Sequence, residues 1–407
     1  MESELRFSTE IRKESSVLLL DFGTLFIKAT LLTEGDQSAH FHDYVATIRN
    51  QIYYISEEKA KRLRADSKDE ISIPTGYFTR REIEEQKLLF QADPVYVQID
   101  AVPKNAPILV KAYQNLCEEL EKELEINSIV NNYENWSVVV AIAAFETQEA
   151  QKDVEKVHEI ATKQLGFKSI YINSQIMFDY ISQIHYLKTS GLQDGYCFII
   201  NIGGGDTEVA AISGVPIMHT FRRFPIAGQE ITLYCQKVLQ EQLQITGIML
   251  NTIEEWLMEG GTVNEDAPPT IKKFKKRELD IRPLLNAPQL LFDFNKYWAK
   301  ERRFNSITEI ISESIDSLIN TTAFSEGIGL ILQAVIVVGG AANYRGLTQR
   351  LELELKSLYP EFMDSIHVFS GDQPQMSGIN GIRQLIRMKY KDQNGLNFTL
   401  LNEKYSG

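Results

Sequence analysis

Three segments of the chain share one pattern of positions, a run of apolar β-forming residues followed by a turn rich in glycine. They are residues 17–32, 197–212 and 334–351. In the first two, β-branched and apolar residues resume after the turn, which predicts a β-hairpin. In the third, the glycine pair at 339–340 is followed by apolar residues at helical spacing, which predicts a strand, a turn and then a helix.

Helical periodicity fills the regions between these segments. Apolar residues recur every three or four positions in 109–124, 149–165 and 307–322, which predicts amphipathic helices. Residues 136–144 form a continuous apolar run typical of a buried strand. Helices that alternate with apolar strands indicate an α/β protein. The two hairpins, each opening its own set of elements, suggest an internal duplication.

Two stretches interrupt this alternation. Residues 33–105 are rich in charge and carry only short extended pieces, so we interpret them as a mostly exposed insertion. Residues 239–303 contain the loop signals EGGTVNEDAPP and NAPQ and read as similarly irregular. Within that second stretch, the apolar residues of 248–258 either pack inside their own domain or form a partner surface.

Composition narrows the class of protein. The chain has 407 residues, of which 43% are hydrophobic and 24% charged; this is ordinary for two or three globular domains of roughly 150 residues. No apolar run reaches the roughly 18 residues of a membrane-spanning helix, and the polar first fifteen residues do not resemble a secretory signal. We therefore expect no membrane association. Three cysteines are too few for a disulfide framework and indicate a reducing compartment, cytosol or nucleus.

The charge balance bears on the partners of the protein. The chain has 55 acidic and 42 basic residues, a formal net charge of −13. A surface of this sign repels phosphate backbones, so we expect no direct binding of nucleic acid. Residues 271–279 form one basic stretch, which is typical of a solvated face and is also open to binding an acidic partner.

The first two glycine turns carry residue types that bind phosphate. Backbone N–H groups at glycine approach a phosphate without hindrance from a Cβ atom. Lys28 can neutralise phosphate charge, and Asp21 can hold the water shell of Mg²⁺. Taken singly, each turn also fits a plain hairpin, with Asp21 as a satisfied turn carboxylate. The candidate residues are Asp21, Gly23, Thr24 and Lys28 in the first turn and Gly203, Gly204, Gly205, Asp206 and Thr207 in the second.

The three motifs are far more specific together. DFGTLFIK, INIGGGDTEVA and IVVGGAANYRG occur in this order and resemble the phosphate-1, phosphate-2 and adenosine motifs of the actin, Hsp70 and sugar-kinase superfamily. The resemblance implies ATP or ADP with Mg²⁺, held by two hairpins from opposite lobes, with Asp21 acting on Mg²⁺ through water. It adds four nucleotide-binding positions, Asn201, Gly339, Gly340 and Tyr344.

The actin-related proteins are the branch that the rest of the chain resembles. Residues 214–239 are similar to the actin stretch in which a strand leads into an Ala-Gly turn and a helix, and 376–386 to its hinge-proximal glycine segment. Too few residues follow Gly340 for the peptide-binding domain of an Hsp70. The resemblance implies an actin-like two-lobed α/β fold, built from duplicated ribonuclease H-like domains with an inserted subdomain in each lobe.

The resemblance also implies where the two lobes begin and end. Lobe I is expected to comprise residues 16–193 and 374–407, with 33–105 as its outer subdomain. Lobe II is expected to comprise residues 194–373, with an insertion at about 239–303. Each lobe then opens with one glycine hairpin.

Several departures from the family pattern bear on ATP hydrolysis. Where hydrolysing members have an aspartate at the start of phosphate-2, this chain has Asn201, which cannot act as a base. The water-positioning histidine of the family falls on Glu208, whereas its glutamine matches Gln175. Leu25 stands where actins have a second glycine and crowds the pocket of the terminal phosphate. Gln175 is thus the one candidate catalytic residue, and we expect nucleotide binding with little or no hydrolysis.

Three functions compete. The first is a structural actin-related protein that works as a nucleotide-binding subunit of a hetero-complex, with actin or another actin-related protein among its partners. By resemblance that complex is cytoskeletal, dynactin-like or axonemal, or else remodels chromatin, so the cytoplasm is expected and the nucleus is the alternative. The second is a polymerising ATPase, which the irregular outer subdomain disfavours. The third is a small-molecule kinase, which Asn201 disfavours because a kinase needs a carboxylate base.

Overall fold

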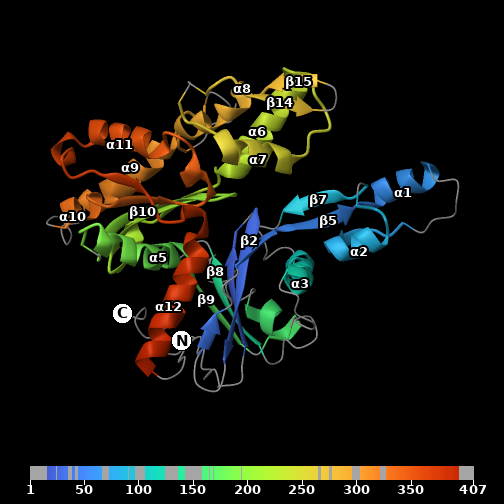
Figure 1. Cartoon of the computed structure of the whole chain (residues 1–407), viewed down its shortest axis with the longest axis horizontal. Coiled ribbons are helices and arrows are strands. Elements are labelled where there is room, and N and C mark those ends of the chain that lie inside the picture. Colours follow the sequence, from blue (N-terminus) through green and yellow to red (C-terminus); the bar gives the residue numbers. More distant parts are fainter. Residues whose placement is uncertain are drawn as a thin grey trace. The chain divides into compact units, whose positions relative to one another are not determined.

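A computed structural model describes most of the chain. The described residues are 16–23, 25–34, 39–41, 45–66, 73–89, 91–96, 106–123, 136–142, 158–164, 166–167, 169–193, 195–264, 267–274, 277–295, 303–320 and 327–393. They form two compact units (Figure 1), one of residues up to 175 with those from 382 onward, the other of residues 176–381. The lobe limits expected from the sequence stay a prediction.

The first unit is built on a six-stranded sheet. Its order is β3-β2-β1-β8-β9, with β4 also paired to β2. β1 and β2 are antiparallel, whereas β8 and β9 continue the sheet in parallel with β1. The hairpin predicted at 17–32 is confirmed, and so is the strand predicted at 136–144 as far as Ile142; residues 143–144 lie outside the described residues. The strands are β1 (Ser16–Phe22), β2 (Phe26–Glu34), β3 (Ala39–Phe41), β4 (Ala46–Arg49), β8 (Trp136–Ile142) and β9 (Ser169–Ser174).

The second unit repeats this topology. Its sheet has the order β12-β11-β10-β16-β17, with β13 paired to β11, so each strand has a counterpart of the same direction in the first sheet. The repetition confirms the internal duplication predicted from the two hairpins. The strands are β10 (Tyr196–Ile202), β11 (Thr207–Ser213), β12 (Val215–Pro216), β13 (Arg222–Phe224), β16 (Val335–Val338) and β17 (Val368–Ser370).

Amphipathic helices cover the sheets, because each buries one apolar stripe. In α3 (Ala106–Glu123) that stripe includes Tyr113, Leu116 and Leu120, all fully buried. The helices predicted at 109–124 and 307–322 are confirmed as α3 and α9 (Ile307–Ile319), with residues 124 and 321–322 outside the described residues. The remaining helices that follow the predicted α/β alternation are α5 (Gln175–Thr189), α6 (Gly228–Glu241), α10 (Ile328–Leu332), α11 (Leu347–Leu358) and α12 (Ser377–Gln393).

The helix predicted at 149–165 is confirmed only in part. Residues 149–157 and 165 lie outside the described residues. Of the remainder, Ile160–Gln164 adopts the wider π-helical winding instead of a regular α-helix. Such π turns are short and rare, so apolar periodicity does not predict them.

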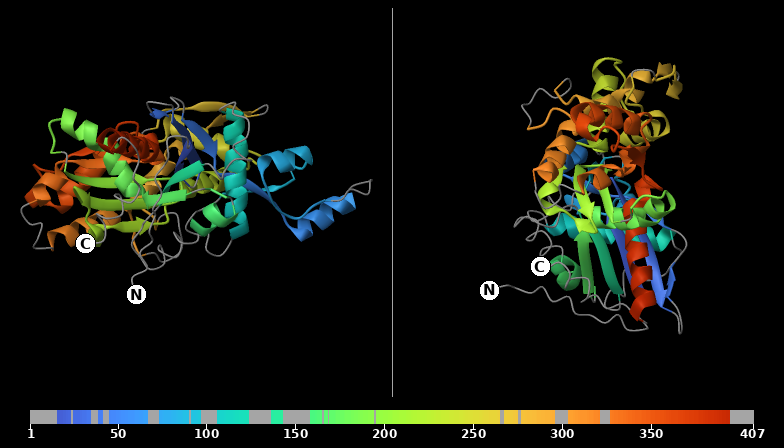
Figure 2. Two further views of the ribbon diagram at one scale, coloured as in Figure 1. Left: turned by 90° about the horizontal axis from the view of Figure 1, so that it is seen from below. Right: turned by 90° about the vertical axis from the view of Figure 1, so that its left-hand side faces the viewer.

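The segment expected to be a mostly exposed insertion has a core of its own. A three-stranded sheet of order β6-β5-β7 packs with two short helices around five buried side chains, Ile55, Ala60, Ile73, Ile83 and Ala92. Its apolar residues lie far apart in the sequence among many charges, which hides the core from a periodicity search. In Figure 1 and the left view of Figure 2 this group extends away from the first sheet. Its elements are β5 (Gln51–Ile55), α1 (Glu57–Asp66), β6 (Gly76–Phe78), α2 (Arg80–Glu85) and β7 (Asp93–Tyr96).

The stretch 239–303 is also more regular than its loop signals suggest. Ile248, Trp256 and Leu257 are buried in the core of the second unit, so the idea that 248–258 presents them to a partner is wrong. The basic stretch forms an exposed hairpin in which Lys272 pairs with Glu259. The elements are α7 (Leu250–Gly260), β14 (Ile271–Phe274), β15 (Arg277–Asp280), α8 (Arg282–Leu285) and the 3₁₀ helix Ala287–Phe292.

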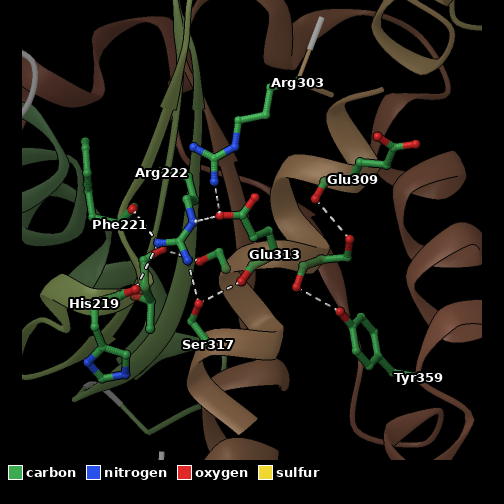
Figure 3. A network of polar contacts seen from close by, with 11 residues as sticks. His219, Phe221, Arg222, Arg303, Glu309, Glu313, Ser317 and Tyr359 are labelled. Atoms are coloured by element: carbon green, nitrogen blue, oxygen red, sulfur yellow. Dashed lines mark hydrogen bonds and ion pairs between the residues drawn. The ribbon is translucent and has the colours of Figure 1, made fainter. Parts of the chain in front are cut away.

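A polar network anchors α9 to the second sheet (Figure 3). Arg222 of β13 donates to Glu313 of α9 at 2.7 Å, and Arg303 donates to the same carboxylate. On the other side of α9, the Tyr359 hydroxyl donates to Asp316 at 2.8 Å. These charge-assisted bonds fix the helix that covers β11 and β13.

Two further features concern the apolar length of the helices and the state of the cysteines. Among the described helices, none is long and apolar enough to cross a membrane. The three cysteines, Cys117, Cys197 and Cys235, are free and buried. Burial raises the pKa of the Cys197 and Cys235 thiols, which keeps them protonated and unreactive.

Candidate functional site

The first hairpin brings Asp21 and Lys28 together. They are direct cross-strand partners on β1 and β2, and Lys28 Nζ lies 3.0 Å from Asp21 Oδ2. Asp21 is only 1% exposed, and its second oxygen, Oδ1, has no hydrogen-bond partner among the described residues. In the turn, Asn50 donates to the carbonyl of Gly23 at 2.8 Å. Thr24 lies outside the described residues.

The second hairpin leaves two glycine N–H groups available in its turn. The carbonyls of Gly203 and Gly204 accept from the first two N–H groups of α6, at 3.1 and 2.7 Å. This satisfies N–H groups that a helix start otherwise leaves unpaired. The N–H groups of Gly204 and Gly205 donate to no backbone carbonyl of the described residues, and both glycines are partly exposed. The turn can therefore donate to an anion, as a phosphate site requires.

The polar residues that follow the second turn are engaged within the unit. The Thr207 hydroxyl is buried and donates to the Ile226 carbonyl at 2.7 Å. Arg223 of β13 donates to Asp206 through Nε at 2.6 Å, and the same nitrogen lies 3.7 Å from Glu208. Glu208 is 2% exposed. The Arg223 guanidinium thus lies beside both carboxylates.

Asn201 has a partner that the sequence did not reveal. Its Nδ2 donates at 2.6 Å to Oδ2 of Asp179, a fully buried residue of α5. Ser377, at the start of α12, donates to the other oxygen of Asp179. One signal was present in the sequence: Asp179 and Gln183 are polar residues four positions apart, so they share a face of the helix, and the structure buries both.

The adenosine-like motif lies beside Asn201. Gly339 has a φ of +90°, and a Cβ there would come within 2.4 Å of the Ile202 carbonyl oxygen, so only glycine fits. After it, the 3₁₀ helix Gly340–Asn343 begins, and Tyr344 is buried with its ring against Gly261. Beside Gly340, no described atom lies within 4 Å of the position a Cβ would take, which leaves room for a planar ligand.

A cavity of about 330 Å³ opens next to this motif within the second unit. Asn343 and Arg345 line it from the motif, and Trp256, Glu259 and Lys272 line it from α7 and the β14–β15 hairpin. Its volume falls in the range of small-molecule pockets, and its lining combines the aromatic ring of Trp256 with polar and charged side chains. By resemblance to the actin family, a ribose-contacting segment is expected near Glu254 and Glu255, although the match assigns neither residue. Glu254 is buried, and neither residue lines the cavity.

Each unit thus gathers its own set of predicted residues. Asn201, the glycines of 203–205, Asp206, Thr207 and Gly339 lie together in the second unit. Asp21, Gly23 and Lys28 lie together in the first, and Gln175 begins α5. Among the described residues no cluster of three or more His, Cys, Asp or Glu side chains could hold a metal ion directly.

Comparison with known proteins points to one family name. No protein-family model matches the chain. The chain is 24% identical over 236 residues to Actin-related protein 2 of Acanthamoeba castellanii, an alignment that covers 51% of this chain and 53% of the relative. For Actin-related protein 2 of Drosophila melanogaster the identity is 25%, with 52% and 53% covered. For that of Saccharomyces cerevisiae it is 21%, with 55% and 59% covered. The matches thus span about half the length of these curated relatives.

Proposed function

The chain is a divergent actin-related protein with an actin-like fold, and from this premise we propose that it binds an adenine nucleotide and serves as a structural subunit of a larger protein complex, with little or no ATP hydrolysis. The observation that carries the proposal is the repeated glycine hairpin. Asp21 and Lys28 in one unit occupy the same register positions as Asn201 and Glu208 in the other.

Different residues would bind the phosphates and the adenosine of the nucleotide. The N–H groups of Gly204 and Gly205 would donate to phosphate oxygens, and Lys28 would neutralise phosphate charge. The open side of Gly340 and the cavity beside Asn343 would take the adenosine. Gly23, Thr24, Asp206, Thr207 and Tyr344 would shape the two turns and the motif around it.

The residues also fit a hydrated magnesium ion. Asp21 Oδ1 is a buried carboxylate oxygen with no hydrogen-bond partner among the described residues, and it would accept from a water of the ion's shell. Bound Mg²⁺ supplies positive charge that offsets the phosphates. The protein contributes the orientation of Asp21, which the ion pair with Lys28 holds in place.

Slow hydrolysis follows from the groups around the second turn. Attack on a phosphoryl group needs a group that orients or deprotonates water. Asn201 is a neutral amide tied to Asp179, and Glu208 lies against Arg223. Gln175 would be the one remaining residue that positions water.

The role in a complex rests on the surface and on the family. The proposed partners are other protein subunits, among them actin or another actin-related protein. The proposed complex is cytoskeletal, dynactin-like or axonemal, in the cytoplasm, with a chromatin-remodelling complex in the nucleus as the alternative. The small sheet and helices within 51–96 have a hydrophobic core of their own and would offer a surface to a partner, with charges of both signs on α1.

The proposal is tested on protein purified from its native source. Acid extraction followed by chromatography should release about one ATP or ADP per chain, and one defined set of subunits should co-elute on size exclusion. A chain without bound nucleotide, whose melting temperature does not respond to added Mg-ATP, would overturn the nucleotide role. A chain that elutes alone from gently lysed cells would overturn the subunit role.

A further inference from the structure

Asp179 is a buried carboxylate in a position that the proposed nucleotide site does not use. It lies on α5 with no exposed surface, within the second unit. We propose that Asp179 is a positioning residue, which holds the amide of Asn201 so that the amide oxygen faces the turns at Gly203 and Gly339, both within the second unit. The second turn therefore presents a neutral acceptor of fixed orientation.

Hydrogen-bond chemistry sets that orientation. An ionised carboxylate only accepts, so the Asn201 group that faces Asp179 must be its NH₂, and the 2.6 Å contact joins these two groups. The amide oxygen is then directed away from Asp179. It lies against the glycine turns, since a Cβ built at Gly339 would come within 2.6 Å of Oδ1 and one at Gly203 within 3.8 Å.

The carboxylate is itself held from a second side. The Ser377 hydroxyl donates to Asp179 Oδ1. Four residues further along α12, the backbone packs so tightly on α5 that a Cβ at Gly381 would meet the Phe178 carbonyl oxygen at 1.8 Å. Asp179 is thus fixed between α5, the end of β10 and the start of α12. A buried charge with donors on both oxygens avoids part of the cost of desolvation.

The contact with Asp179 determines how the substitution Asn201→Asp would affect stability. The substitution Asn201→Asp would press two carboxylates against each other in a buried site, where both cannot remain ionised. Asp179→Asn alone keeps an acceptor for the Asn201 NH₂ group. The double variant Asp179→Asn/Asn201→Asp keeps the same hydrogen bond with donor and acceptor exchanged. We therefore expect the fold to be stable with one carboxylate and one amide at positions 179 and 201, in either order, but not with two carboxylates.

The test is a four-member cycle of wild type, the two single variants and the double variant, melted without nucleotide from pH 5.5 to 8.5. At pH 8, Asn201→Asp should melt about 5 °C or more below wild type, Asp179→Asn within about 2 °C, and the double variant near Asp179→Asn. The deficit of Asn201→Asp should grow as pH rises, because a carboxyl whose folded-state pKa is raised loses stability above its unfolded pKa. The charged residues around the pair are the same in all four proteins: Glu208, the cross-strand partner of Asn201, Arg223 beside it, and Asp372, whose backbone N–H donates to Gln183 of α5.

The outcomes are decisive in both directions. An Asn201→Asp protein as stable as wild type at pH 8, or a double variant no more stable than Asn201→Asp, would overturn the positioning role. If Asn201→Asp does not fold at pH 8, the comparison uses pH 5.5 and the double variant, whose failure to fold would equally overturn it. Because no nucleotide is present, this result is independent of whether the chain binds ATP.

Discussion

Asn201 lies directly across the β10–β11 hairpin from Glu208, at the same register as the Asp21–Lys28 pair of the β1–β2 hairpin. In the first unit that position holds a carboxylate and a lysine joined by an ion pair. In the second unit, the Asn201 amide donates to Asp179, and the Glu208 carboxylate lies 3.7 Å from Arg223 Nε. The duplicated fold thus gives equivalent register positions different charges.

A β-branched side chain in the second turn should abolish nucleotide binding. Gly204→Val adds a branched side chain to the turn whose N–H groups are proposed to bind phosphate and whose carbonyls accept from the start of α6. The ATP-induced rise in melting temperature, measured by scanning fluorimetry, should disappear. The matched control is Gly195→Ala, where a Cβ would meet no described atom within 4 Å; its response to ATP should equal wild type. An undiminished shift in Gly204→Val would place the phosphate site elsewhere.

Loss of the Asp21 charge should lower the affinity of the protein for Mg-ATP. Asp21→Asn removes the buried oxygen proposed to accept from an ion-bound water and releases Lys28 from its ion pair. Affinity for Mg-ATP, measured by titration calorimetry, should fall about tenfold, or about 1.4 kcal/mol. Asp93→Asn is the control, because it also removes a carboxylate paired with a lysine but at an exposed site of the same unit. Equal affinities for Mg-ATP in the two variants would contradict the assignment.

ATP turnover should be very slow. We propose, from the family resemblance, that Asn201 and Glu208 stand where hydrolysing members have groups that prepare water, and the loss of one such group costs about 10²–10⁴ in rate. Phosphate release from purified protein should therefore lie at least that far below the rate of a polymerising actin assayed beside it. Turnover at the rate of that actin would exclude the structural role.

Recovery of turnover should require two substitutions. Asn201→Asp alone places a carboxylate against Asp179, whereas Asp179→Asn/Asn201→Asp gives the new carboxylate a donor. The double variant should release phosphate faster than wild type in a single-turnover assay. If it folds and binds ATP without any gain, Glu208 or Leu25 is the block.

The chain should not form a homopolymer. Polymerisation repeats one heterologous contact, so both faces must be complementary. The surface helix α1 carries acidic and basic residues together, and among residues 57–65 only Ala60 is fully buried, so burial of this helix against a second copy would cost desolvation. Sedimentation at high protein concentration with Mg-ATP should leave a monomer in the supernatant. Cooperative pelleting above a critical concentration would favour the polymerising ATPase instead.

Local patterns predicted much of the architecture. The hairpins at 17–32 and 197–212, the helices at 109–124 and 307–322 and the buried strand at 136–144 depend on short-range periodicity, and the structure has each of them. The core of the small sheet was missed because its five buried residues are scattered among charged ones. The burial of Trp256 was left open for a related reason, since a short helix between loop signals shows too few apolar positions to reveal its partner.

The sequence by itself determined the two glycine hairpins, their order before the adenosine-like motif, and the residue types at each register position, because these depend on neighbours along one strand or turn. Only the tertiary structure decided which side chains meet. Asp179 precedes Asn201 by 22 positions and Ser377 follows it by many more, and their contact exists because α5 and α12 pack beside the end of β10. Long-range packing leaves no local period in a sequence, so the orientation of the Asn201 amide is a property of the fold alone.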